Sequence, residues 1–249
     1  MIGIIISAGS GKRISNDVKD LPKSLLMING KPLIDYQIQA LKQVGIKDIV
    51  VITGRHDNKF ELNNVQYVKD HYYEKHDVLG SLMEAKDFLK NDVLVLYSDI
   101  IFESKVIQQI IDSKGDISIA IDMNWEKKYK GRTEHPKHEA ENVQLNEIKK
   151  IIKIKKNIKD NNGNVGEFLG IMKFSSYGSE LFVKKYEELI ETHHGSFQQA
   201  SSISGAYLTD MIQELVDSKI DVTPIFISGK WCEIDTMQDL NKAEKIFPS

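Results

Sequence analysis

The sequence opens with Met1-Ile-Gly-Ile-Ile-Ile-Ser-Ala-Gly-Ser-Gly-Lys-Arg13, followed after a short spacer by Leu21-Pro22-Lys23. The apolar run at 2–6 is typical of a buried strand in a parallel sheet. Small residues from Ser7 to Gly11 follow, so the backbone N–H groups there are accessible to a ligand. Cations come next at Lys12, Arg13 and Lys23. A strand, open N–H groups and positive charge together predict a polyphosphate site.

The first half of the chain alternates between strand-like and helix-like patterns. This alternation predicts an α/β fold with a parallel sheet and right-handed crossovers. Residues 93–97 have the clearest pattern of a buried strand in the chain, and Ser98-Asp99 lies at its carboxyl end, where open α/β sheets bind ligands. The expected strands are 2–6, 49–52, 65–68, 93–97 and 117–121, and the expected helices are 33–44, 82–89 and 104–111.

The middle of the chain breaks this alternation. Residues 125–142 are polar and lack a clear period, and strand-like runs at 148–154 and 166–174 then flank the turn signal Asp160-Asn-Asn-Gly163. We expect a hairpin-like, β-rich insertion that covers the nucleotide half and supplies a second substrate's pocket. Helices are expected at 180–190, 206–216 and 237–246, and extended segments at 222–227 and 231–234.

The chain contains no linker long enough to separate independent domains, so we expect one domain over 1–249. Within it, 1–122 would form the nucleotide-binding half and 123–175 the acceptor-binding insertion. Residues 176–249 would supply C-terminal helices and a second metal-ligand segment.

Composition narrows the possible partners and location. A net charge of -3 gives no broad basic field, so nucleic acid is not an expected partner. The single cysteine, Cys232, excludes an intramolecular disulfide. No apolar stretch has membrane-spanning length, and 2–6 lacks the features of a signal peptide. We therefore expect a cytoplasmic protein without a membrane partner.

Two named phosphate motifs fail at the opening stretch. A P-loop needs a glycine five positions before the Gly-Lys pair and Ser or Thr after it, but Ile6 and Arg13 occupy these positions. The dinucleotide fingerprint needs a glycine at position 14, which is Ile14. P-loop enzymes are excluded and Rossmann dehydrogenases are disfavoured.

A third pattern fits. Ala8-Gly-Ser-Gly-Lys-Arg13 with Pro22-Lys23 resembles the signature of the nucleotidyltransferases that make sugar nucleotides and CDP-alcohols. Four later segments (132–136, 139–141, 205–210 and 233–236) are similar to the cytidylyltransferases of phosphonate pathways, which are relatives of the phosphocholine cytidylyltransferases. The resemblance covers nearly the whole chain. It implies a three-layer, Rossmann-like nucleotidyltransferase fold with a mixed, mostly parallel central sheet.

The resemblance also implies a catalytic set. Asp99 and Asp235 would hold Mg²⁺, a hard cation that prefers oxygen ligands, although either aspartate could instead cap a helix. Arg13 would contact the β- and γ-phosphates, and Lys23 would stabilise charge at the α-phosphate. The residues expected to bind the nucleotide are Ala8, Gly9, Ser10, Gly11, Lys12, Arg13, Lys23, Gly80, Ser81 and Ser98.

The acceptor is less sharply defined. Arg132, His135 and Lys137 could bind a doubly charged phosphonate, and Glu167 could pair with a primary amine. Tyr207 is assigned to the same site by the resemblance of its segment. The faces of Trp125, Tyr129 and Trp231 would instead suit a quaternary ammonium.

The expected function is magnesium-dependent transfer of CMP from CTP to a small phosphonate, such as 2-aminoethylphosphonate, or a phosphorylated alcohol, with release of pyrophosphate. No general base is needed, because such acceptors are already ionised near pH 7. Alternatives are a phosphocholine cytidylyltransferase, a sugar-1-phosphate nucleotidyltransferase, and a catalytically silent nucleotide-sensing module. Nothing in 7–23 selects cytosine physically, so CTP is implied by the resemblance alone.

Overall fold

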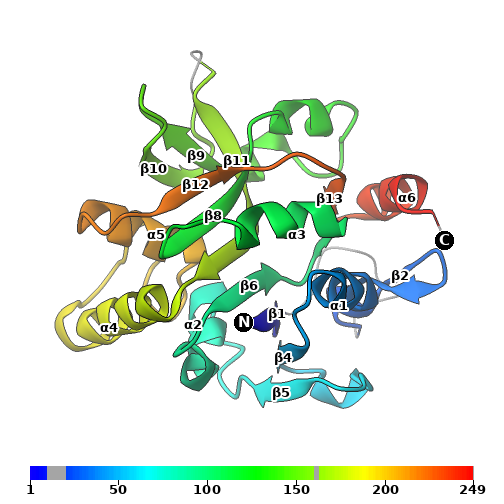
Figure 1. The fold of residues 1–249 in the computed structure, drawn as a ribbon, viewed down its shortest axis with the longest axis horizontal. Coiled ribbons are helices and arrows are strands. Elements are labelled where there is room, and N and C mark those ends of the chain that lie inside the picture. Colours follow the sequence, from blue (N-terminus) through cyan, green and yellow to red (C-terminus); the bar gives the residue numbers. More distant parts are fainter. Residues whose placement is uncertain (10–20, 160–162, 249) are drawn as a thin grey trace.

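The computed structural model describes residues 1–9, 21–159 and 163–248. The expected α/β fold with a mixed, mostly parallel central sheet is confirmed (Figure 1). The main path of the sheet has the order β10-β9-β11-β6-β1-β4-β5, and β8 pairs with both β11 and β12. Its strands are β1 (Ile2–Ser7), β4 (Asp48–Thr53), β5 (Gln66–Lys69), β6 (Val93–Tyr97), β8 (Ile117–Asp122), β9 (Glu141–Leu145), β10 (Ile151–Lys156), β11 (Val165–Phe174) and β12 (Thr223–Phe226).

Helices cover both faces of this sheet and give the expected three layers. Successive residues of β1 point to opposite faces, so Ile4 packs in the core on one face and Ile5 in the core on the other. The core around Ile4 includes α2 (Val78–Glu84), α4 (Ser176–Thr192) and α5 (Leu208–Asp217). The core around Ile5 includes α1 (Leu33–Gln43) and α3 (Ser104–Ile111).

Strand β11 joins the parallel half of the sheet to the insertion. Its first residues pair with β9 and its last residues pair with β6, both antiparallel. Between them Gly170 has a φ of +67°, and a Cβ there would lie 2.3 Å from the ring of Tyr97. A side chain at this position would therefore collide with the ring, and glycine permits the irregularity that turns residues 167–169 toward the cleft described below.

Two predictions about elements are wrong. The 148–154 and 166–174 runs do not pair with each other, because β9 lies between β10 and β11. Strand β9 begins with the polar residues Glu141 and Asn142, which hid it within the polar 125–142 segment. The helix expected at 82–89 instead begins at Val78, after the N-cap Asp77, and ends at Glu84.

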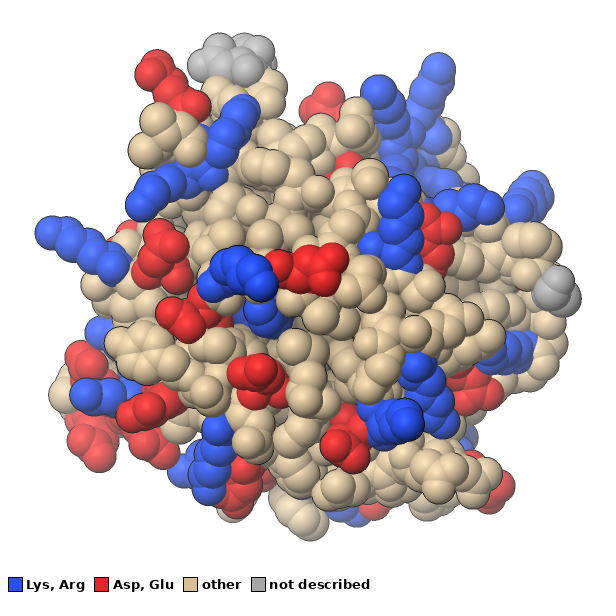
Figure 2. Space-filling view, viewed as in Figure 1, with Lys and Arg blue, Asp and Glu red and all other residues tan. Residues whose placement is uncertain are grey.

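Two short two-stranded sheets hold the C-terminal helix against the rest of the domain. Strand β7 (Ile100–Phe102) pairs with β13 (Trp231–Glu233), and β2 (Met27–Ile28) pairs with β3 (Lys31–Pro32). Helix α6 (Met237–Ile246) contacts both β13 and β2. Figure 2 shows cationic and anionic side chains interspersed over one face of the molecule. Among the described residues, we find no helical segment with the length and apolar character needed to cross a bilayer.

Candidate active site

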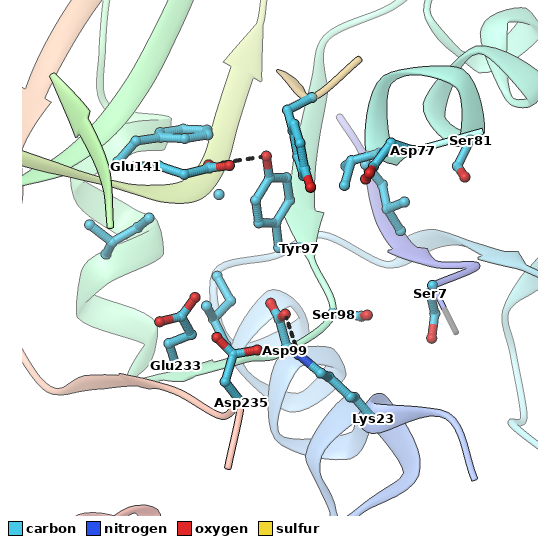
Figure 3. Close-up of a pocket in the computed structure, with 18 of the residues that line it drawn as sticks. Ser7, Lys23, Asp77, Ser81, Tyr97, Ser98, Asp99, Glu141, Glu233 and Asp235 are labelled. Carbon is cyan, nitrogen blue, oxygen red and sulfur yellow. Dashed lines mark hydrogen bonds and ion pairs between the residues drawn. The ribbon is translucent and has the colours of Figure 1, made fainter. Parts of the chain in front are cut away.

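A cleft of about 410 Å³ opens at the carboxyl ends of β1 and β6. In Figure 3, Asp77 and Ser81 lie on one side of the cleft, Glu141 and Glu233 lie on the other, and Tyr97 lies between them, so we divide the lining into two arms. We call the first the α2 arm, lined by Tyr73, His76, Asp77, Val78 and Ser81. We call the second the acidic arm, lined by Tyr97, Glu141, Glu167, Trp231 and Glu233. Lys23, Asp99 and Asp235 lie together where the arms meet.

Many of the predicted site residues line this cleft: Ala8, Gly9, Lys23, Ser81, Ser98, Asp99, His135, Glu167, Tyr207 and Asp235. Gly80, Arg132 and Lys137 do not line it. Ser10, Gly11, Lys12 and Arg13 lie outside the described residues, so their predicted roles stay predictions.

Lys23 is positioned by the start of a 3-10 turn, Lys23–Leu25. The next residue, Ser24, is fully buried, and its Oγ lies 2.6 Å from Oγ of Ser7 at the end of β1. This contact ties the turn to the carboxyl edge of the sheet. From there Lys23 Nζ lies 3.3 Å from Asp99 Oδ2 and also donates to Asp235 Oδ1.

Backbone pairing brings the two aspartates together although they are far apart in sequence. Strand β13 pairs antiparallel with β7, with Glu233 opposite Ile100. The Ile234 N–H then donates to the Asp99 carbonyl oxygen at 2.8 Å. Neither aspartate is a helix cap: Glu103 precedes α3, and Thr236 caps α6. The helix-cap alternative for these residues is therefore wrong.

The charges at this junction are strongly coupled. Burial alone lowers the pKa of Lys23, but Asp99 and Asp235 outweigh that effect and raise the pKa above its usual value. Burial also raises the pKa of Asp99. For Asp235, burial is outweighed by hydrogen bonds from His135 and Lys23, which hold its pKa below the usual range. Lys23 is thus a fixed cation held beside two carboxylates.

The junction has the donor chemistry of a divalent-cation site. Asp99 and Asp235 offer carboxylate oxygens, the ligands that hard cations prefer. His135, Glu233 and Asp235 bring ligand atoms within 4.8 Å of one another, and His135 Nδ1 lies 2.9 Å from Asp235 Oδ2. The residues therefore fit a divalent cation at Asp235 and its neighbours His135 and Glu233, while Asp99 is joined to Asp235 through the Lys23 ammonium.

The acidic arm collects three carboxylates. Tyr97 donates to Glu141 Oε2 at 3.3 Å, and Tyr129 donates to Glu167 Oε1 at 2.6 Å. The second oxygen of Glu167 is buried and has no hydrogen-bond partner among the described residues. Removal from water raises the pKa of Glu141 to about 8 and, together with repulsion from Glu233, that of Glu167 to about 8. Burial and Asp235 raise the pKa of Glu233 to about 7. A cation in this arm would relieve these penalties.

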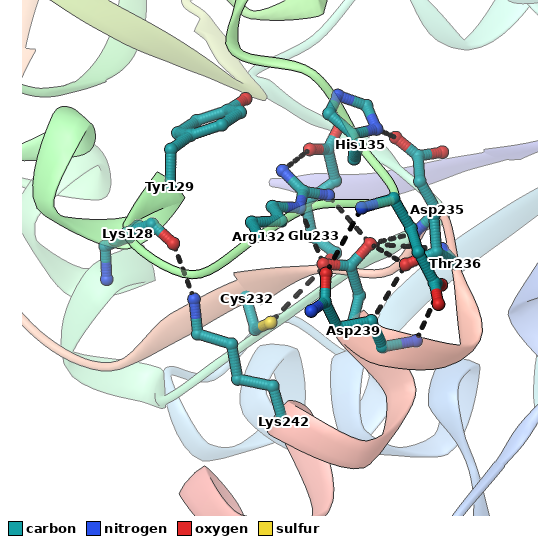
Figure 4. A network of polar contacts seen from close by, with 12 residues as sticks. Lys128, Tyr129, Arg132, His135, Cys232, Glu233, Asp235, Thr236, Asp239 and Lys242 are labelled. Atoms are coloured by element: carbon teal, nitrogen blue, oxygen red, sulfur yellow. Dashed lines mark hydrogen bonds and ion pairs between the residues drawn. The ribbon is translucent and has the colours of Figure 1, made fainter.

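Arg132 was expected to bind the acceptor, but its side chain does not line the cleft. Its side chain is 7 % exposed and binds Asp239 through Nε at 2.6 Å and Nη2 at 2.9 Å, while Nη1 contacts Glu233 at 3.0 Å (Figure 4). Asp239 also accepts from the backbone N–H groups of Asp235 and Thr236. Arg132 therefore fastens the insertion to the start of α6 and the Asp235 segment.

The other expected acceptor groups are also engaged by the chain itself. Lys137 is exposed, pairs with Glu126 and lies 5.0 Å above the Trp125 ring. Arg132 lies 5.0 Å from the centre of the Tyr129 ring, and Lys128 Nζ lies 4.7 Å above Trp231. Each aromatic face that we considered for a quaternary ammonium thus carries a cation of this chain.

The α2 arm contains residues that the sequence interpretation missed. Asp77 caps α2 by accepting from the Val78 N–H at 2.8 Å, and it also accepts a hydrogen bond from Tyr207. Tyr207, expected at the acceptor site, therefore lies against the α2 arm. Asp77 could have been found as an N-cap candidate before an apolar run. Glu141 carried no such local signal.

Comparison with known proteins agrees with this geometry. The MobA-like NTP transferase domain matches residues 3–137. The CTP:phosphoglutamine cytidylyltransferase of Campylobacter jejuni is 29 % identical over 96 % of this chain and 98 % of its own. The choline-phosphate cytidylyltransferase of Streptococcus pneumoniae is 34 % identical over 42 % of this chain and 47 % of its own.

Solved structures share the fold across the whole chain. The CTP:phosphocholine cytidylyltransferase from Streptococcus pneumoniae has a TM-score of 0.73 at 23 % identity, covering 98 % of each chain. The inositol-1-phosphate CTP transferase from T. maritima has a TM-score of 0.74 at 20 % identity, covering 98 % of this chain and 94 % of its own. The expected enzyme class is confirmed: this chain belongs to the MobA-like NTP transferase domain family and is a nucleotidyltransferase.

Proposed function

We propose that this nucleotidyltransferase is a magnesium-dependent cytidylyltransferase that transfers CMP from CTP to a small amine-bearing phosphonate such as 2-aminoethylphosphonate. The observation that carries the proposal is the meeting of Lys23, Asp99 and Asp235 between two chemically different arms. In this proposal 1–122 supplies the nucleotide half and 123–175 the acceptor arm of a single domain. The whole-length similarity to a CTP:phosphoglutamine cytidylyltransferase supports CTP as the donor.

The residues at the junction fit the chemistry of this transfer. The acceptor oxyanion forms a bond to the α-phosphorus, the bond from that phosphorus to the bridging oxygen breaks, and pyrophosphate leaves with the electron pair. Both reactants are anionic, so charge neutralisation is the first requirement. Lys23 supplies a permanent positive charge for the α-phosphate, since its pKa is raised. Asp99 and Asp235 would hold Mg²⁺, which when bound acts as a Lewis acid and a template.

The acidic arm supports an acceptor that carries a primary amine. Its carboxylates, and above all the unpaired oxygen of Glu167, provide acceptors for an ammonium N–H. A quaternary ammonium has no N–H to donate and depends on aromatic faces. The three rings considered for this role, Trp231, Tyr129 and Trp125, each already carry a cation of this chain. This difference favours an aminoalkyl phosphonate over phosphocholine. It also disfavours a sugar 1-phosphate, because an uncharged sugar would bring no positive charge to the carboxylates of the acidic arm.

An acceptor panel tests the proposal. Pyrophosphate release from CTP and Mg²⁺ would be measured with 2-aminoethylphosphonate, phosphocholine, phosphoglutamine and glucose 1-phosphate, and the CMP adduct identified by mass spectrometry. We expect the highest kcat/KM with 2-aminoethylphosphonate. A higher value with phosphocholine would overturn the argument from the aromatic faces. Tight CTP binding without turnover on any acceptor would identify a nucleotide-sensing module instead.

A further inference from the structure

A buried carboxylate lies behind the α2 arm and has no part in the chemistry described so far. The Asp70 side chain is fully buried, and its oxygens accept three hydrogen bonds. One comes from the Tyr72 N–H at 2.8 Å. The others come from side chains that line the cleft, Ser81 Oγ at 2.8 Å and His76 Nδ1 at 3.1 Å.

These contacts fix the direction of two hydrogen atoms. Because a carboxylate only accepts, the Ser81 hydroxyl hydrogen and the His76 Nδ1 hydrogen both point at Asp70. Ser81 Oγ is left with its lone pairs, and His76 Nε2 is an acceptor whenever Nδ1 carries the only proton of the ring. Asp77 in the same arm adds a carboxylate. Asp70 therefore makes these polar side chains of the α2 arm present acceptors to a ligand.

We propose that Asp70, acting through Ser81 and His76, makes the α2 arm select a nucleobase with an amino group at the position of cytosine N4 or adenine N6, where uracil, thymine and guanine have a carbonyl oxygen. The inference rests on the proposed function and assigns the nucleoside of the triphosphate to the α2 arm, whose residues belong to the nucleotide half. Cytosine and adenine present an amino group where uracil and thymine present a carbonyl oxygen. The amino group can donate hydrogen bonds to the acceptors of this arm. A carbonyl oxygen cannot donate, so these acceptors would be left without hydrogen-bond partners.

The shape of the arm agrees with this assignment. Apolar Ile6 and Val78 line the cleft together with these acceptors and offer surfaces to a planar ring.

Asp70, His76 and Glu84 also form a group with the ligand spacing of a metal site. Both Asp70 oxygens are already engaged by N–H and O–H donors, and Glu84 Oε1 lies 3.9 Å from His76 Nδ1. This arrangement is a hydrogen-bonded network that orients the cleft residues.

The test compares nucleotides rather than acceptors. Binding of CTP, ATP, UTP and GTP would be measured by calorimetry for the wild type, Asp70→Asn and Asp87→Asn. The kcat/KM for pyrophosphate release would be measured with each nucleotide for the same three proteins. We expect the wild type to prefer CTP over UTP by at least about tenfold. In Asp70→Asn the new amide can donate to Ser81 Oγ and turn its hydroxyl toward the cleft. The CTP-to-UTP ratio should then fall by about ten- to hundredfold. Asp87→Asn, the same substitution in an exposed residue outside the cleft lining, should keep the wild-type ratio.

Ser81→Ala provides a second route, since Asp70 is buried and its variant could fail to fold. Removing the hydroxyl should lower the CTP-to-UTP ratio by weakening CTP without weakening UTP. The inference would be overturned if folded Asp70→Asn and Ser81→Ala both keep the wild-type CTP-to-UTP ratio. It would also be overturned if the wild type binds UTP as tightly as CTP. Turnover with ATP in place of CTP would support amine selection and overturn the proposed donor. Absence of turnover with every nucleotide would overturn the proposed function, while the binding ratios would still decide the inference.

Discussion

The two arms of the cleft hold their polar groups in opposite ways. In the α2 arm, Asp70, His76 and Ser81 come from one short stretch of chain, and each is satisfied by a neighbour. In the acidic arm, Glu141, Glu167 and Glu233 come from three separate strands, and their burial close to one another raises the pKa of each. The first arrangement is built to orient hydrogen bonds, and the second to receive positive charge. A transferase that joins a nucleotide to an amine-bearing anion needs both.

The largest expected effect is at the junction of the arms. Asp99→Asn removes a charged oxygen ligand, so we expect kcat to fall by on the order of a thousandfold. Calorimetry without metal should show CTP binding close to that of the wild type, since the α2 arm is untouched. Equal losses in turnover and in metal-free binding would reject the metal role of Asp99.

A substitution at Arg132 tests whether this side chain holds the insertion against α6 or instead contacts the acceptor. Arg132→Met leaves the Asp239 carboxylate without its bidentate partner, so the free energy of unfolding should fall by about 3–5 kcal/mol in urea denaturation. Lys137→Met is the matched control, because its exposed pair with Glu126 is worth at most about 1 kcal/mol. Wild-type stability with a raised acceptor KM would instead place the guanidinium in the cleft.

A substitution at Glu167 distinguishes the two arms, because it should change the KM for the acceptor and not the KM for CTP. Glu167→Gln keeps the shape of the side chain but cannot form the carboxylate that would pair with the ammonium of the acceptor, so the KM for 2-aminoethylphosphonate should rise by about ten- to hundredfold. The KM for CTP should change little. Glu126→Gln, an exposed residue of the same type, serves as the control. A shift in the CTP constant would place the nucleotide in the acidic arm.

The smallest effect concerns pH. Burial raises the pKa of Glu141 from 4.5 to about 8, so the folded state binds the proton more tightly than the unfolded chain. The stability from that proton is fully present below pH 4.5 and is lost as pH rises through about 8. Glu141→Gln should therefore match the wild-type Tm at pH 4 and exceed it by about 2–4 °C at pH 9. A constant difference between the two proteins at all pH values would contradict this account.

The sequence predicted the parallel half of the fold well because its signals are local. Strand β1 and helix α3 follow from runs of a few residues, and Asp99 follows from its place after β6. The pairing of β7 with β13, which brings Asp235 to Asp99, carries no periodic signal and was not predicted; the family resemblance implied only that the two aspartates share a metal. Arg132 was misplaced for a similar reason. Its charge suggests an anion site, but its partner Asp239 lies 107 residues away and is recognised only after α6 has docked.

A crystal structure with Mg²⁺, 2-aminoethylphosphonate and a CTP analogue that cannot release pyrophosphate tests the central claim most directly. We predict the cytosine amine beside Ser81, the metal between Asp99 and Asp235, and the acceptor amine at the unpaired oxygen of Glu167. Cytosine in the acidic arm, or a metal bound away from both aspartates, would contradict the division of the cleft into a nucleotide arm and an acceptor arm.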